Sequence, residues 1–224
     1  MSIANWMPGE GPRDKLLERG AQALSDAELL AVLLHTGYRD CSALDMARNL
    51  LNQFLGLSGV MQAGQSSLLA CTGMGPVKYS QLQAAQELAR RQALQVISSG
   101  DALSSPSETR RFLQYHLGGR SREVFSCLFL DSQHRVLRCE DLFLGTLDGA
   151  AVYPREVAVR ALQYNAAAVI FAHNHPSGIA EPSRADRRIT ERLCAALALL
   201  DIRVLDHIII GRGRAFSFAE EGLL

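Results

Sequence analysis

The sequence is organised around Ala172–Asp186, which reads A-H-N-H-P-S-G-I-A-E-P-S-R-A-D. His173 and His175 are two residues apart and end an apolar run, so on a β-strand both imidazoles leave the same face. Asp186 follows after a loop rich in proline, serine and glycine. Two imidazoles and one carboxylate, with no cysteine nearby, leave a fourth position open, which is the ligand count of a catalytic rather than a structural zinc.

The same stretch also has a purely structural interpretation. A lone His-x-His pair is common at strand ends, and Ser183 followed three residues later by Asp186 resembles a capping box at a helix start. The two interpretations are compatible, because a capped helix N-terminus that presents Asp186 can also hold a metal. The order of the parts favours metal binding: an apolar strand, the histidine pair, a Pro-Ser-Gly turn, and then the serine and aspartate at a helix start.

His173-x-His175, seven residues, Ser183, two residues and Asp186 match the pattern H-x-H-x(7)-S-x(2)-D without a gap. This pattern is similar to the signature of the JAMM (MPN+) zinc metalloproteases, and the wider run resembles their bacterial RadC branch. The resemblance covers essentially the full length of the chain. Further matches to the RadC pattern are Arg122-Glu123, Leu130-Asp131, Gly145-Thr146, Pro154-Arg155-Glu156, Asp206-His207 and Ser217-Phe218-Ala219-Glu220.

The resemblance implies a fold, a metal and roles for individual residues. The implied fold is the α/β/α sandwich of JAMM domains, and the implied cofactor is Zn²⁺. The expected zinc ligands are His173, His175 and Asp186. Glu123 stands where the family's general-base glutamate opens a buried strand as E-x-x-G, although Ser126 replaces the glycine. Ser183 occupies the position of the serine that stabilises the oxyanion.

Several of these residues also have plain structural interpretations. Glu123, beside Arg122, reads from the sequence alone as a solvated charge at a strand end, and Ser183 is equally an N-cap. His207 precedes an apolar run, where it either orients a metal ligand through its ring N–H or is a hydrogen-bonded core histidine. The chain has no H-E-x-x-H helix, no zinc-deaminase pattern and no Walker-type loop, which excludes those classes.

The composition is that of a globular protein without a strong charge bias. The 224 residues are 48% hydrophobic and 21% charged, with 23 Lys+Arg against 23 Asp+Glu, so neither half predicts a strongly basic nucleic-acid surface. The five cysteines are scattered, which predicts reduced thiols and a cytoplasmic location. Met1–Gly11 lacks the order of a signal peptide, and no apolar run reaches the roughly 20 residues that cross a bilayer.

The region from Pro12 to about Gln95 is predicted to be helical. Within it, Leu68–Lys78 predicts a short helix, a Gly-x-Gly turn and a second helix, which resembles a helix-hairpin-helix module. In such a module the hairpin amides meet a nucleic-acid phosphate. Gly73, Gly75 and Lys78 are therefore candidate DNA contacts, although the same turn is equally an ordinary helix–helix connection used for packing or protein docking.

The expected domains are a helical domain over residues 1–97 and a metal-binding domain over residues 102–224. Val96–Ser105 is rich in serine and predicts a linker, and Ser105 with Pro106 predicts a new helix start. Beyond it, apolar runs alternate with helical periodicity, which predicts a sheet flanked by helices. The predicted fold class is α/β, with a helical region preceding an α/β/α sandwich.

Two functions follow as hypotheses. The first is a zinc-dependent peptidase or isopeptidase of JAMM type, with Glu123 as general base and an unknown peptide or protein as substrate. The second is a non-catalytic DNA-associated or partner-binding protein whose zinc braces the fold, with DNA contacted by the N-terminal helical domain. Neither hypothesis involves a membrane, and the sequence indicates neither the substrate nor the oligomeric state.

Overall fold

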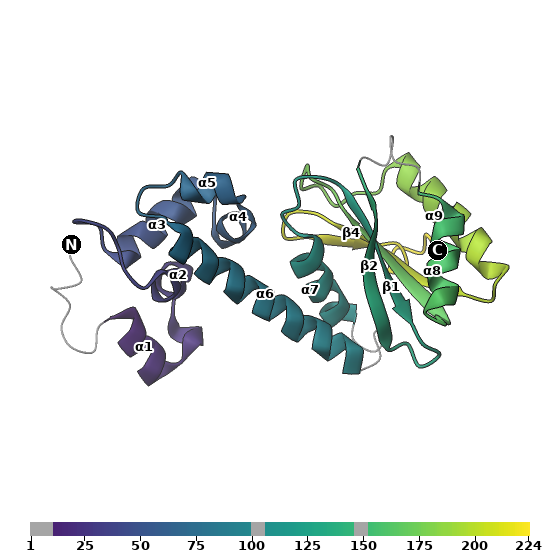
Figure 1. The fold of residues 1–224 in the computed structure, drawn as a ribbon, viewed down its shortest axis with the longest axis horizontal. Coiled ribbons are helices and arrows are strands. Elements are labelled where there is room, and N and C mark those ends of the chain that lie inside the picture. The colour runs from purple at the N-terminus through teal and green to yellow at the C-terminus, as the bar shows by residue number, and fades with distance from the viewer. Residues whose placement is uncertain (1–10, 100–105, 146–151) are drawn as a thin grey trace. The chain divides into compact units, whose positions relative to one another are not determined.

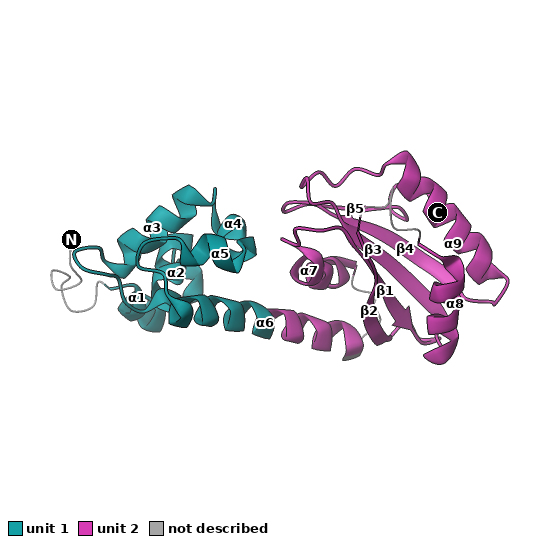
Figure 2. Ribbon diagram, turned by 45° about the horizontal axis from the view of Figure 1, so that its top comes forward, with its two compact units in different colours: residues 1–88 teal, residues 89–224 magenta. Residues whose placement is uncertain are grey.

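The structure is a computed structural model that describes residues 11–99, 106–145 and 152–224. The chain divides into two compact units, Met1–Leu88 and Ala89–Leu224 (Figure 2). Most of the N-terminal stretch examined for a signal peptide lies outside the described residues, as do Thr146 and the Gly100–Ser105 part of the predicted linker. The expected domain limits therefore stay a prediction. In the described part of the chain, no helix combines the length and the apolar character needed to cross a bilayer.

The N-terminal unit is helical, as predicted. Its elements are α1 (Pro12–Arg19), a 3₁₀ turn (Ala21–Ala23), α2 (Asp26–Leu34), α3 (Ala43–Gln53), α4 (Leu57–Gln62), α5 (Gln65–Leu69) and the first part of α6 (Pro76–Ser99). Ser25 and Glu28 form a capping box at the start of α2. One prediction is wrong: Val96–Ser99 belong to α6 and not to a linker, because the helix continues past the expected end at Gln95.

Two of the three candidate DNA contacts, Gly73 and Gly75, lie in the turn between α5 and α6, and Lys78 lies in the first turn of α6. Gly73 has a φ of +84°, and a Cβ there would lie 2.1 Å from the Tyr38 ring, so only glycine fits this close approach. The Lys78 ammonium donates to the carbonyl oxygens of Gly73 at 3.0 Å and Gly37 at 3.3 Å. Gly75 has open space around it. These contacts give Gly73 and Lys78 a role in packing the unit, while DNA binding stays a prediction.

The C-terminal unit contains one five-stranded mixed sheet with strand order β2-β1-β3-β4-β5 (Figure 1). Its elements are α7 (Pro106–Leu117), β1 (Val124–Leu130), β2 (Val136–Leu144), α8 (Pro154–Gln163), β3 (Ala168–Asn174), α9 (Arg184–Ala198), β4 (Arg203–Ile210) and β5 (Ala215–Ser217). The predicted alternation of strands and helices after the linker is present. Only β3 and β4 run parallel among the paired neighbours, and the α/β fold class is confirmed.

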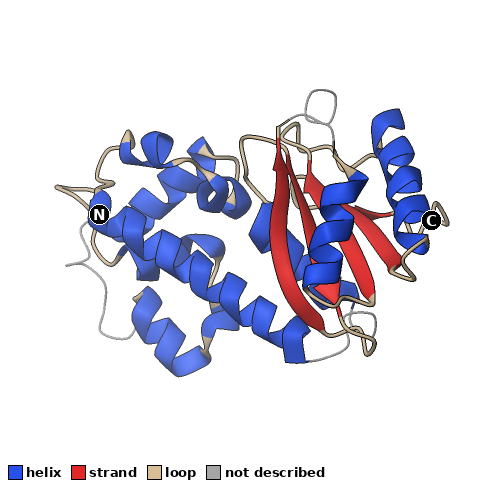
Figure 3. Cartoon of the chain, turned by 45° about the vertical axis from the view of Figure 1, so that its right-hand side comes forward, coloured by secondary structure: helices blue, strands red, loops and turns tan. Residues whose placement is uncertain are grey.

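Helices cover both faces of this sheet (Figures 1 and 3). Because side chains alternate along a strand, Val124 and Leu128 point into the core shared with α7, whereas Phe125 and Phe129 point into the core shared with α8 and α9. The central strand β3 is buried along its whole length. His173 follows Phe171 on the α9 side of the sheet, so its ring faces the helix that carries the aspartate of the motif.

Candidate metal centre

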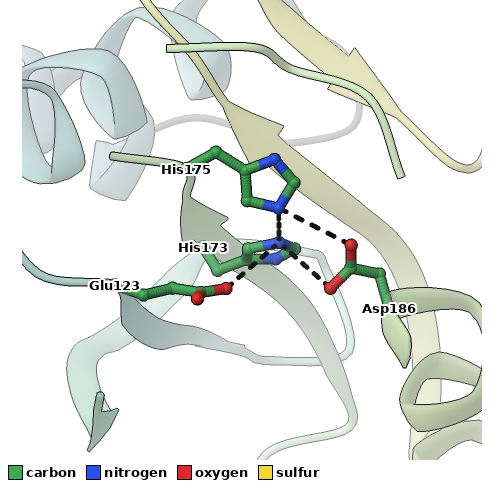
Figure 4. A group of neighbouring side chains, drawn as sticks. All are labelled: Glu123, His173, His175 and Asp186. Carbon is green, nitrogen blue, oxygen red and sulfur yellow. Dashed lines mark hydrogen bonds and ion pairs between the residues drawn. The ribbon is translucent and has the colours of Figure 1, made fainter. Parts of the chain in front are cut away.

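The structure brings His173, His175 and Asp186 together at the end of β3. The Nε2 atoms of the two histidines lie 2.9 Å apart (Figure 4). Asp186 comes from the first turn of α9, with Oδ1 3.3 Å from His173 Nε2 and Oδ2 3.6 Å from His175 Nε2. Ligand atoms around a tetrahedral zinc with bonds near 2.1 Å are about 3.4 Å apart. The three side chains therefore have the spacing that one metal ion requires.

Glu123 lies on the other side of His173 from Asp186 (Figure 4). Its side chain is 13% exposed, and Oε1 lies 3.9 Å from His173 Nε2. All four residues place a ligand atom within 4.8 Å of the others. Glu123 is thus close to the cluster but farther from His173 Nε2 than the two neighbouring ligand atoms are.

The Asp186 carboxylate uses one oxygen in a capping box, and its other oxygen accepts no hydrogen bond. Its backbone N–H donates to Ser183 Oγ at 3.1 Å, and its Oδ2 accepts from Ser183 N at 2.7 Å, which confirms the predicted capped start of α9. Asp186 Oδ1 is the one buried side-chain polar atom in the described part of the chain that lacks a hydrogen-bond partner. A buried carboxylate oxygen without a partner is costly, and a bound cation removes that cost.

A chain of hydrogen bonds behind the site fixes the tautomer of His173. Thr190 Oγ1 lies 2.6 Å from both the Asp186 carbonyl oxygen and His207 Nδ1. A carbonyl only accepts, so the single hydroxyl hydrogen goes to Asp186 O and His207 Nδ1–H donates to Thr190. His207 Nε2 then accepts from His173 Nδ1–H at 2.8 Å. His173 Nε2 therefore carries a lone pair and faces the unpartnered Asp186 oxygen.

The electrostatics of the site keep His173 Nε2 and the Asp186 carboxylate unprotonated. Burial lowers the pKa of His207 to about 4, and burial together with His207 lowers the pKa of His173 well below its usual value. Burial alone would raise the pKa of Asp186, but hydrogen bonds from His175 and Ser183 and the nearby His173 outweigh it and hold that pKa far below normal. A lone pair and a carboxylate 3.3 Å apart fit a cation between them.

When it is protonated, His175 places a positive charge beside the Asp186 carboxylate. Its Nδ1–H donates to the carbonyl oxygen of Ile179 at 2.8 Å, which turns Nε2 toward Asp186. The hydrogen bond with Asp186 raises the pKa of His175 above its ordinary value. A proton on His175 Nε2 and a metal ion therefore compete for the same position.

Two residues that support the site, Thr190 and Asn174, drew no attention in the sequence. Thr190 stands four residues after Asp186, one helical turn on, and that spacing is the only signal for it. Asn174 lies between the two histidines. Ser126, which replaces the family's glycine, is buried on the opposite sheet face and donates to Asp141 Oδ1 at 2.7 Å, so this departure does not touch the cluster.

Comparison with known proteins identifies the family of the chain. Residues 103–223 match the family described as the RadC-like JAB domain, and residues 3–80 match the UPF0758 N-terminal family. UPF0758 proteins from Tolumonas auensis, Aeromonas hydrophila and Thioalkalivibrio sulfidiphilus are 55%, 56% and 57% identical to this chain over 224 residues, with 100% of both chains covered. The chain therefore belongs to the UPF0758 family of proteins with a RadC-like JAB domain.

Proposed function

We propose that this protein is a zinc-dependent hydrolase of the JAMM type that cleaves a peptide or isopeptide bond. One observation carries the proposal: His173 Nε2 and Asp186 Oδ1 are two buried acceptors 3.3 Å apart, with His175 Nε2 beside them. Zinc bound by these three side chains would supply a Lewis acid and lower the pKa of a water molecule to about 7.

Glu123 has the position of a general base. Its carboxylate is mostly shielded from solvent and lies 3.9 Å from His173 Nε2, beyond the distances that relate the other three side chains. From there it takes the proton of the attacking water and passes it to the leaving nitrogen. Ser183 uses an Oγ lone pair to cap α9, which leaves its own hydrogen to donate to an oxyanion.

The alternative is a zinc that only braces the fold of a DNA-associated or partner-binding protein. A structural zinc is normally enclosed by four protein ligands, and it makes no use of a carboxylate standing back from the ligand set. The longer separation of Glu123 therefore supports catalysis over bracing.

The test compares zinc content and hydrolysis in three variants. Purified protein is expected to carry about one zinc, to lose it in His173→Ala, and to keep it in the matched control His134→Ala, whose histidine lies in the β1–β2 turn. Glu123→Gln is expected to keep zinc while cleavage of an internally quenched peptide library falls about 10²- to 10⁴-fold. Zinc-free wild-type protein would overturn the metal site. Undiminished cleavage by Glu123→Gln would overturn the role of that glutamate.

A further inference from the structure

Asn174 separates the two histidines of the site but faces away from them. Alternation along β3 sends its side chain to the sheet face opposite His173, and the residue is only 3% exposed. A buried amide requires polar partners, because an unpaired amide in such a place is costly.

All the partners of the Asn174 amide come from the segment that carries Glu123. Its Oδ1 accepts from the backbone N–H of Val124 at 2.9 Å. Its Nδ2 donates to the carbonyl oxygen of Arg122 at 3.0 Å and to that of Arg120 at 3.3 Å. One donor and two acceptors also determine which end of the amide is the oxygen. The side chain therefore holds the backbone immediately before and after Glu123.

The main-chain pairing of β1 with β3 ends just before this point. The last paired residues are Phe125 and His173. Beyond them His175 N donates at 2.9 Å to Ile210 O on β4, and Glu123 O accepts at 2.9 Å from Gly145 N beside β2. The backbones of Glu123 and His175 are thus each bonded to an outer neighbour. The Asn174 amide takes the place of the missing backbone hydrogen bonds between the two segments.

We propose that Asn174 is a positioning residue that fixes Glu123 beside the metal ligands; this inference rests on the proposed function. The ligands have supports of their own, since His173 is bonded to His207 and Asp186 is part of the α9 capping box. Glu123 lies before the first residue of β1. Loss of the amide therefore moves the carboxylate and leaves the ligand set in place, and a displacement near 1 Å is enough to lower a rate about 10²-fold.

The experiment compares Asn174→Ala with Glu123→Gln and with the control Ser126→Ala. Ser126 is also buried, and its hydrogen bond to Asp141 lies on the same sheet face as the Asn174 side chain. Asp141 is bonded to the Arg120 side chain at 3.2 Å, whereas Asn174 is bonded to the backbone on both sides of Glu123. Each full-length variant is titrated with zinc. The visible spectrum of its Co²⁺-loaded form is also recorded as a function of pH, and the pH at which half of the spectral change has occurred is taken as the Co²⁺ pH midpoint. Amide hydrogen exchange reports on Val124 N–H. Asn174→Asp keeps an acceptor for Val124 N but loses both donors to the backbone carbonyls. It replaces Asn174→Ala if the latter fails to fold, and is then compared by its Co²⁺ spectrum and zinc affinity alone.

The expected result is a specific one. Asn174→Ala binds zinc within about threefold of wild type, exchanges the Val124 amide faster, and shifts the Co²⁺ pH midpoint to that of Glu123→Gln. The double variant has the same midpoint as Glu123→Gln alone, since Asn174 acts through that carboxylate. Ser126→Ala keeps the wild-type midpoint.

Two further outcomes separate this inference from the proposed function. A wild-type midpoint in Asn174→Ala, or shifts that add in the double variant, would overturn the role of Asn174 while zinc binding stands. Wild-type protein that binds neither zinc nor Co²⁺ would overturn the proposed function itself, and the role of Asn174 with it.

Discussion

At the residue scale, the proton on His175 is expected to control binding of the proposed metal. The pKa of His175 is raised by its hydrogen bond with Asp186, so the protonated form persists to a higher pH than for an ordinary histidine. Metal binding has to displace this proton, because neutral imidazole is the ligand.

We therefore predict that zinc affinity increases with pH through and above the ordinary histidine pKa of about 6.5 and levels off once His175 is neutral. On the rising part, the dissociation constant falls about tenfold per pH unit, with about one proton released per zinc bound. Calorimetric titration in two buffers of different ionisation enthalpy measures both quantities. A dissociation constant that stays unchanged between pH 6 and pH 8 would contradict the competition.

Thr190 is predicted to act on the metal without touching it. Thr190→Val removes the acceptor of His207 Nδ1–H, so His207 no longer has to present a bare Nε2 to His173. Zinc affinity is expected to fall about 10- to 100-fold, the usual effect of losing such an outer hydrogen bond. Thr190→Ser keeps the hydroxyl and is expected to restore binding. An affinity for Thr190→Val within twofold of wild type would remove the argument for a fixed tautomer.

At the scale of single elements, the same kind of capping box starts two helices, and at one of them it also orients a residue of the candidate site. The Ser25 box starts α2 and is far in the chain from the ligands, whereas the Ser183 box starts α9 and also orients Asp186. We predict that Ser25→Ala and Ser183→Ala each weaken their helix start by about 1 kcal/mol, seen as faster hydrogen exchange in its first turn. Only Ser183→Ala is expected to lower zinc affinity as well. Equal zinc binding by both variants would show that the cap does not orient the ligand.

The strands and the clustering of His173, His175 and Asp186 could be predicted because their signals are local. Val124–Leu130 is a continuous apolar run, and the spacing from His173 to Asp186 is a short motif. The end of α6 could not be predicted in this way. Ser98 and Ser99 suggest a linker, but Ile97 is buried against the α7 side of the sheet, and this packing extends the helix.

The supports of the candidate site were also out of reach from the sequence. One partner of Asn174, Val124, lies 50 residues earlier in the chain, and no periodicity in the sequence indicates such a contact. Thr190 supports the site through its hydrogen bond with His207, which lies on β4, whereas Thr190 lies on α9. Both contacts exist only once β1, β3, β4 and α9 have come together.

At the scale of the whole molecule, the four residues of the candidate site belong to one compact unit. All of them lie within Ala89–Leu224. A ligand that binds only the folded form stabilises the unit that holds it, by about 2.7 kcal/mol at a free concentration one hundred times the dissociation constant.

Scanning calorimetry is therefore expected to show that zinc raises the melting temperature of the C-terminal unit and that a chelator lowers it. The transition of Met1–Leu88 is expected to stay in place, and His173→Ala is expected to abolish the response. A zinc-dependent shift that persists in His173→Ala would place the metal elsewhere.

The central position of β3 also determines when during its synthesis the molecule becomes competent. The histidine strand is flanked by β1, made earlier, and by β4, made later. Pairing between distant segments is slow compared with local helix formation. A nascent polypeptide on the ribosome thus has His173 and His175 before it has His207 to hold the His173 ring. Chains that end before β4 consequently lack the hydrogen bond that fixes the His173 tautomer.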